Sequence, residues 1–205
     1  MKMPGRQVRT GLALLFVLLV AWVILQVAFK QEPVYRQLDQ FVFTEKSASI
    51  VKQKIQTEID RFRNSDSPTA QIAAVAHIIE CSQYLMYEKK LKVEQYYDYM
   101  RMMTLPAQRR QIKDKTKYID DTKRYLRRKR NLYIKYLSYS LSTPQFPAGD
   151  RAGALEAEVY VLRRSDKGDE TIRYNFRKHK NNRYYLLLDK SRGGVPFRLE
   201  EGTDG

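Results

Sequence analysis

The stretch that decides the fold covers residues 157–189, AEVYVLRRSDKGDETIRYNFRKHKNNRYYLLLD. Apolar and polar side chains alternate along it, which is the pattern of strands that bury one face. Clusters of Asp, Lys, Gly and Asn interrupt the alternation twice and have the composition of tight turns. The pattern therefore predicts an antiparallel meander with strands at 157–164, 170–178 and 183–189. A short fourth strand at 195–199 would suit a sheet edge, because it contains a proline.

Helical periodicity precedes these strands. Apolar residues recur at steps of three and four, and the pattern predicts helices at about 46–63, 67–90, 93–103 and 107–142. The second helix has a clear start, because Ser67 can cap the first free N–H groups and Pro68 lacks an N–H to leave unpaired. It is also apolar almost all round, so we expect it at the centre of the core.

Helices followed by an antiparallel sheet are typical of an α+β fold. Three or four strands are marginal alone, so we expect the meander to pack on the helices. We predict about four helices, of which the last is long and basic. The predicted divisions are a cytoplasmic tail at 1–10, a transmembrane anchor at 11–29, a juxtamembrane linker at 30–45, a helical region at 46–142, a Pro- and Gly-rich linker at 143–154, the sheet at 155–199 and a disordered tail at 200–205.

The anchor is predicted from GLALLFVLLVAWVILQVAF at residues 11–29, which carries no charge. A helix of this length spans about 28 Å, close to the hydrocarbon thickness of a bilayer. The run is longer than the apolar part of a cleavable signal peptide and ends without a small-residue cleavage site. We therefore favour a retained single-pass anchor over a cleaved signal or a buried core helix.

Basic residues near the anchor predict its orientation. Lys2, Arg6 and Arg9 precede it without an acidic residue, whereas the basic residues just after it are accompanied by acidic ones. Because basic residues concentrate on the cytoplasmic side, we expect the N-terminus in the cytoplasm and the C-terminal domain outside it. In a Gram-negative bacterium that domain would lie in the periplasm.

The order of elements resembles one known type of domain. An anchor, helices and a meander that includes Asn181-Asn182-Arg183-Tyr184-Tyr185 are similar to membrane-anchored domains of the nuclear-transport-factor-like type. These include the periplasmic scaffolds of conjugative secretion systems. The similarity covers the order of elements and this one segment, and it includes no diagnostic motif. The helix predicted at 107–142 is longer than that fold contains. We assign the chain to no family on this basis.

The inventory of reactive residues argues against catalysis. No nucleophile elbow, phosphate-binding glycine loop or zinc-protease motif is present, so we expect a protein that is not an enzyme and needs no cofactor. Cys81 is the one cysteine, which excludes an intrachain disulfide. It follows His77 by one helical turn, so a metal site or a thiol–imidazole pair is conceivable. The apolar surroundings favour two core residues instead.

The positive charge is concentrated in one predicted helix. The chain has a net charge of +15, and residues 107–137 hold twelve Lys and Arg against three Asp. At 100° per residue, most of these cations share one arc. We predict a basic docking surface formed by Arg109, Arg110, Lys113, Lys117, Lys123, Arg124, Arg127, Arg128 and Lys135. The opposing arc, expected to face the core, holds Ile112, Tyr118, Ile119, Tyr125, Leu126, Leu132, Tyr133, Tyr136 and Leu137.

Three interpretations of this basic helix remain open. It could be a solvated face, a docking surface for an acidic partner (anionic lipid, an envelope polymer or a protein), or a nucleic-acid binding surface. Nucleic acid ranks last, because no nucleic-acid binding motif accompanies the charge. The sequence thus predicts a membrane-anchored, non-catalytic interaction or assembly scaffold with an exported domain. The alternative is a polyanion-binding protein that uses residues 107–137 to bind anionic lipid headgroups, an envelope polymer or, less favoured, nucleic acid.

Overall fold

The structure is a computed structural model that describes residues 34–44, 48–145 and 155–188. All of these except Val34 belong to one compact unit, Tyr35–Gly205. The predicted anchor at 11–29, the tails at 1–10 and 200–205 and the possible strand at 195–199 lie outside the described residues. Within the described part of the chain, no helix combines the length and the apolar character that a membrane span requires.

Three helices form the core layer: α2 (Ala48–Asn64), α3 (Pro68–Tyr87) and α4 (Val93–Met103). Helix α3 begins as predicted, with the Ser67 hydroxyl accepting a hydrogen bond from the Ala70 N–H at 3.4 Å. It is buried along nearly its whole length and packs between α2 and α4. The prediction that the second helix is central is therefore confirmed, because a helix that is apolar all round has no face to present to water.

Five strands make one antiparallel sheet in the order β1-β2-β3-β4-β5. They are β1 (Val34–Val42), β2 (Tyr136–Gln145), β3 (Glu156–Ser165), β4 (Gly168–Lys178) and β5 (Tyr184–Leu186). The hairpin between β3 and β4 closes on Ser165 and Gly168, which pair across the turn. Gly168 has a φ of +124°, a conformation that side chains disfavour, which accounts for glycine there.

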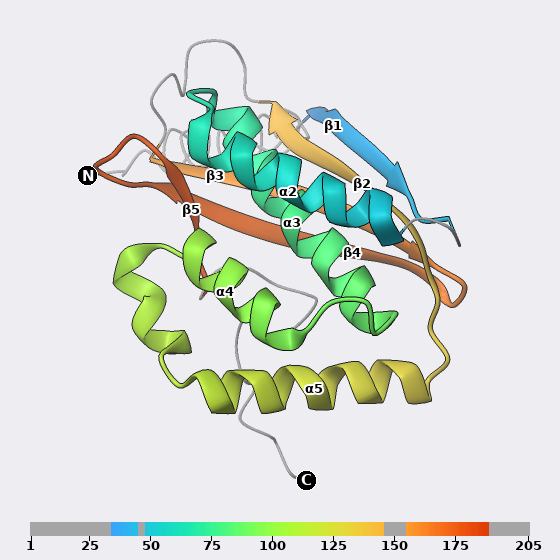
Figure 1. The fold of residues 1–205 in the computed structure, drawn as a ribbon. Coiled ribbons are helices and arrows are strands. Elements are labelled where there is room, and N and C mark those ends of the chain that lie inside the picture. The colour runs from blue at the N-terminus through green and yellow to red at the C-terminus, as the bar shows by residue number, and fades with distance from the viewer. Residues whose placement is uncertain (1–33, 45–47, 146–154, 189–205) are drawn as a thin grey trace, which may run out of the picture. The chain divides into compact units, whose positions relative to one another are not determined.

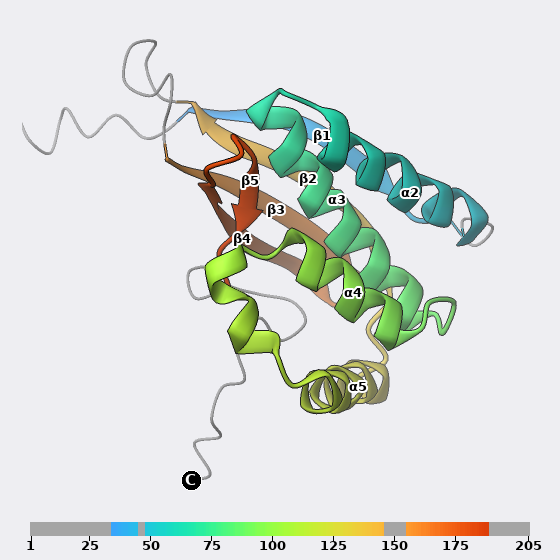
Figure 2. The ribbon, with the colours of Figure 1, turned by 60° about the vertical axis from the view of Figure 1, so that its left-hand side comes forward.

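Figures 1 and 2 show that the helices lie on one face of this sheet, with α3 across its middle. Helix α3 contacts β2, β3 and β5, so the sheet packs on a helix as expected. The side chains that alternate toward this face, among them Val159, Val161, Ile172 and Phe176, are buried in the same core as α3. The α+β class is thereby confirmed.

Two strands lie where the sequence predicted linkers and part of a helix. Strand β1 occupies most of the predicted juxtamembrane linker at 30–45, and β2 begins inside the predicted helical region and continues into the predicted linker at 143–154. The sheet therefore has five strands rather than three or four. Strand β1 was missed because its sequence, VYRQLDQFV, has no clean alternation. Strand β2, YLSYSLSTPQ, does alternate from Leu137 to Ser142, and it was missed because the helical period of the preceding segment was extended through it.

The prediction of one long helix at 107–142 is also wrong. The structure divides that segment into the 3₁₀ helix η1 (Pro106–Ile112), helix α5 (Lys115–Asn131) and strand β2. Asp114 separates the first two, because its carboxylate caps α5 by accepting a hydrogen bond from the Lys117 N–H at 2.9 Å. After Asn131 the backbone turns at Tyr133, which has a positive φ, and the chain enters the sheet.

Candidate docking surface

Helix α5 is amphipathic and packs on the rest of the domain by a narrow inner face. Tyr118, Ile119, Thr122 and Leu126 are buried at helical spacing, and the helix contacts α4 and α3. The Thr122 hydroxyl donates to the Tyr118 carbonyl oxygen at 2.8 Å, which satisfies this polar group inside the contact. The inner face therefore fixes which side of α5 remains exposed.

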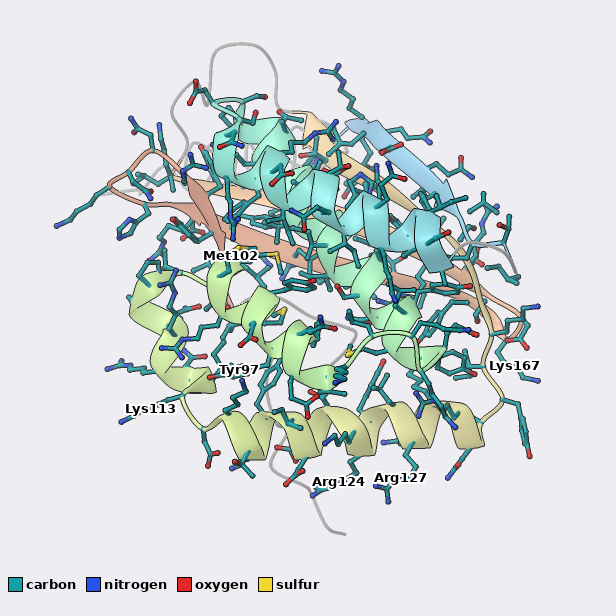
Figure 3. The ribbon with its side chains drawn as sticks, viewed as in Figure 1. Tyr97, Met102, Lys113, Arg124, Arg127 and Lys167 are labelled. Carbon is teal, nitrogen blue, oxygen red and sulfur yellow. The ribbon has the colours of Figure 1, made fainter. Side chains whose placement is uncertain are left out.

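The outer face of α5 is basic. Figure 3 shows Arg124 and Arg127 pointing away from the sheet, and Lys113 extending from the segment that joins η1 to α5. Eight of the nine predicted docking residues are exposed: Arg110, Lys113, Lys117, Lys123, Arg124, Arg127, Arg128 and Lys135. We call these eight residues the basic surface.

Several members of the basic surface have no carboxylate partner nearby. Arg110, Lys113, Lys117, Arg127 and Arg128 form no ion pair with another described residue. The Lys123 Nζ lies 3.5 Å from the Glu94 Oε1. The Arg124 Nη1 lies 3.5 Å from the Oδ1 of Asp121, which is one turn earlier in α5. The Lys123–Glu94 pair is exposed on both sides and contributes little free energy, so Lys123 remains available to a partner. The Arg124 side chain is 78% exposed, whereas the Asp121 side chain that it pairs with is 11% exposed.

The ninth predicted residue, Arg109, is turned inward. Its guanidinium donates to the carbonyl oxygens of Thr104 at 3.3 Å and Met102 at 3.4 Å, at the end of α4. Arg130 does the same for α3, donating to the Tyr87 and Met86 carbonyl oxygens at 2.9 and 2.5 Å. Both side chains satisfy helix-terminal carbonyl groups, so their role is structural.

The C-terminal turn of α5 exposes two large side chains. We define this turn as residues 131–135. Leu132 is 55% exposed and Tyr133 is 82% exposed, although both were predicted to face the core. The prediction was wrong because it extended the helix; the helix ends one residue before Leu132, and the change in backbone direction moves both side chains out of the inner face.

The predicted pair of His77 and Cys81 belongs to a buried polar cluster. The His77 Nδ1 lies 2.7 Å from the Tyr139 hydroxyl, and the Cys81 Sγ lies 3.4 Å from the same hydroxyl. On its other side, the His77 Nε2 lies 2.9 Å from an Asp39 carboxylate oxygen, without the alignment of a hydrogen bond. The described residues hold no group of three His, Cys, Asp or Glu side chains arranged for a metal ion.

Burial sets the ionisation of this cluster. It lowers the pKa of His77 to about 4 and raises the pKa of the Cys81 thiol to about 12. Both groups are therefore neutral at pH 7, and a protonated thiol is a poor nucleophile and metal ligand. This geometry favours the interpretation of His77 and Cys81 as core residues that join α3 to β2.

A second buried network joins α3 to β3. Arg163 donates to both carboxylate oxygens of Glu80, at 2.8 and 2.9 Å, and to the Gln83 side-chain oxygen at 2.9 Å. The Tyr174 hydroxyl donates to the same carboxylate at 2.6 Å. The side chains of Arg163 and Glu80 are 3% and 2% exposed, and a buried pair of this kind needs such hydrogen bonds to offset its desolvation. The remaining Arg163 nitrogen, Nη1, has no hydrogen bond and lies 3.6 Å from a carboxylate oxygen of Glu170. The network holds the central helix in register with the sheet.

No known protein family, curated protein or solved structure matches this chain.

Proposed function

We propose that this protein is a single-pass membrane-anchored, non-catalytic interaction protein that docks an acidic partner on the basic surface of its α+β domain. In this proposal residues 11–29 form the anchor, and the domain lies outside the cytoplasm. The protein would act as an assembly scaffold, in which binding is the activity.

The observation that carries the proposal is the excess of exposed positive charge on α5, where Lys117, Arg127 and Arg128 form no ion pair with another described residue. A helix that only needed a soluble outer face could mix charges of both signs, as the exposed face of α2 does with Lys52, Asp60 and Arg61. Residues 107–137 instead carry twelve Lys and Arg against three Asp. Like charges along one helix repel one another, so their concentration costs stability that an acidic partner would restore.

A polyanion is the alternative partner. An envelope polymer or, less favoured, a nucleic acid would neutralise several cations at once, and its binding would weaken steeply between about 50 and 200 mM salt. A protein partner that adds apolar contacts would show a weaker dependence on salt. A salt titration of the complex therefore separates these two kinds of partner.

The test reverses the charge on the outer face. The variant Arg124→Glu/Arg127→Glu/Arg128→Glu should lose association with its partner, as measured on the full chain by quantitative crosslinking in intact membranes and by affinity purification. All three side chains are exposed, so the fold should persist. Circular dichroism and thermal unfolding of the purified variant check this.

A matched control reverses three exposed cations elsewhere, in β1, in α2 and in the turn before β5: Arg36→Glu/Lys52→Glu/Lys180→Glu. It changes the net charge by the same amount and should keep the association. If the α5 variant keeps every association and phenotype of the wild type, the basic surface is only a solvated face and the proposal fails.

A further inference from the structure

The turn at residues 131–135 combines exposed apolar groups with positive charge. Leu132 and Tyr133 are 55% and 82% exposed, and they come about one helical turn after Arg127 and Arg128 of the basic surface. Lys135 closes the turn and is also exposed. Over residues 127–135 the sequence RRKRNLYIK contains five cations and no acidic residue. Arg127, Arg128 and Lys135 are the exposed ones, since Arg130 is turned inward to the end of α3.

This turn is a fixed structure. The Tyr133 N–H donates to the Arg130 carbonyl oxygen at 2.9 Å and the Ile134 N–H reaches the Lys129 carbonyl oxygen at 3.5 Å, the two bonds of a Schellman motif. The Lys135 N–H donates to the Asp166 carboxylate at 2.7 Å, and the Asp166 N–H donates back to the Lys135 carbonyl oxygen at 3.1 Å. The hairpin between β3 and β4, with Lys167 at its tip, is thereby joined to the turn (Figure 3).

Tyr133 occupies the position of this motif that glycine usually fills. Its φ is +50°, a left-handed conformation that costs free energy for any residue with a Cβ and is rare for bulky ones. The ring is almost fully exposed, so contacts within the described domain do not offset that cost. An outlier of this kind points to a role outside the domain.

We infer that this turn inserts Leu132 and Tyr133 into the interface of an anionic lipid bilayer, while Arg127, Arg128 and Lys135 contact the lipid phosphates. The inference rests on the proposed function and names its partner as a membrane surface. Tyrosine favours the headgroup level of a bilayer, where its ring is in apolar contact and its hydroxyl is hydrated.

A bilayer fits this turn better than an acidic protein does. A protein partner would need a pocket shaped for a protruding Leu and Tyr surrounded by cations, whereas a fluid interface accepts any protruding apolar group. Basic and apolar side chains act together at such interfaces: burial of apolar surface adds to attraction by anionic lipid. Each cation near the anionic surface strengthens binding by about fivefold.

The test measures lipid contact residue by residue in the full chain. Tyr133→Cys is labelled with an environment-sensitive thiol dye and reconstituted into vesicles that contain lipids with a quencher at headgroup depth. Cys81 is fully buried and does not compete for the dye. One set of vesicles is pure phosphatidylcholine and the other mixes phosphatidylcholine with phosphatidylglycerol. A matched control carries the dye at Lys180→Cys, an exposed site in the turn before β5.

The expected result is quenching at position 133 in the anionic vesicles and much less in the neutral ones, with little at position 180 in either. The predicted anchor would insert into both kinds of vesicle, so it does not produce the difference. Adding Arg127→Glu/Arg128→Glu should weaken the docking at position 133 by about 25-fold or more. If Tyr133→Cys does not fold, Leu132→Cys carries the same expectation.

Three results would overturn the inference: no quenching at position 133, equal quenching at positions 133 and 180, or equal quenching in neutral and anionic vesicles. Each of them leaves the charge-reversal experiment on partner association to be judged separately. If that experiment succeeds while the turn stays away from lipid, the basic surface binds an acidic protein. If both fail, the proposed function fails as well.

Discussion

Tyr133 is strained where glycine would not be, and its ring is almost fully exposed. Replacing it with glycine should therefore stabilise the isolated domain by up to about 1 kcal/mol. Relief of the left-handed backbone strain favours the folded state, and the greater conformational freedom of glycine in the unfolded chain offsets part of that gain. Urea unfolding of Tyr133→Gly and wild type measures this. Tyr133→Ala is the control, since alanine keeps the Cβ and should show no such gain. A loss of stability in Tyr133→Gly would mean that the ring packs within the domain.

His77 links the stability of the core to pH. Its pKa falls from 6.5 to about 4 on folding, chiefly because burial disfavours the imidazolium, with Lys54 adding to the effect and the carboxylates of Glu58 and Asp39 opposing it. A lowered histidine pKa means that the unfolded chain takes up the proton first. The stability is therefore complete above about pH 6.5 and is lost as the pH falls toward 4.

The expected loss from His77 alone is at most about 3 kcal/mol across that range. The free energy of unfolding, measured with urea from pH 7 to pH 4, should fall more for the wild type than for His77→Gln, which cannot take up the proton. The carboxylates titrate in both proteins, so the difference isolates the histidine. Parallel curves for the two proteins would show that His77 is not buried in its neutral form.

At the scale of elements, α5 has two faces with opposite tolerance to change. Leu126 is buried where α5 meets the other helices, so Leu126→Ala should lower the free energy of unfolding by about 2–5 kcal/mol. Each exposed substitution among Arg124, Arg127 and Arg128 should change it by less than about 0.5 kcal/mol. Thermal and urea unfolding of Leu126→Ala and of the single substitutions at Arg124, Arg127 and Arg128 measure the difference between the two faces. A Leu126→Ala variant as stable as the wild type would show that α5 is not docked on the domain.

For the whole molecule, the prediction concerns which side of the membrane the domain occupies. The basic residues before position 11 favour a cytoplasmic N-terminus, so a reporter that is active only in the cytoplasm should be silent when fused after Gly205. A reporter that is active only outside the cytoplasm is the matched control and should give a signal. A signal from the cytoplasmic reporter and none from the other would show that the orientation is the reverse of the predicted one, with the basic surface on the cytoplasmic side.

Local pattern was sufficient for several elements. Helix α4 has the predicted bounds, α3 begins at the predicted cap, and β3 and β4 start and end within two residues of the prediction. Each of these has a period, a cap or a turn within its own residues, so its conformation is specified by short-range interactions. The exposure of eight of the nine predicted docking residues was likewise predictable, because a run of cations cannot be buried without partners.

The tertiary structure decided the remainder. Residues 132–137 fit a helix by period alone, yet the chain leaves the helix there because β2 pairs with β3, from Tyr136 opposite Ser165 to Ser142 opposite Tyr160. Strand β1 has no clean alternation and gains its place from that same sheet. The networks that align helix with sheet join residues 62 and 83 positions apart, His77 to Tyr139 and Glu80 to Arg163. The sequence by itself determined the elements whose hydrogen bonds and apolar faces are local. Folding decided those whose partners are distant, and with them the exposure of Leu132 and Tyr133, because a strand's hydrogen bonds exist only once its neighbour is in place.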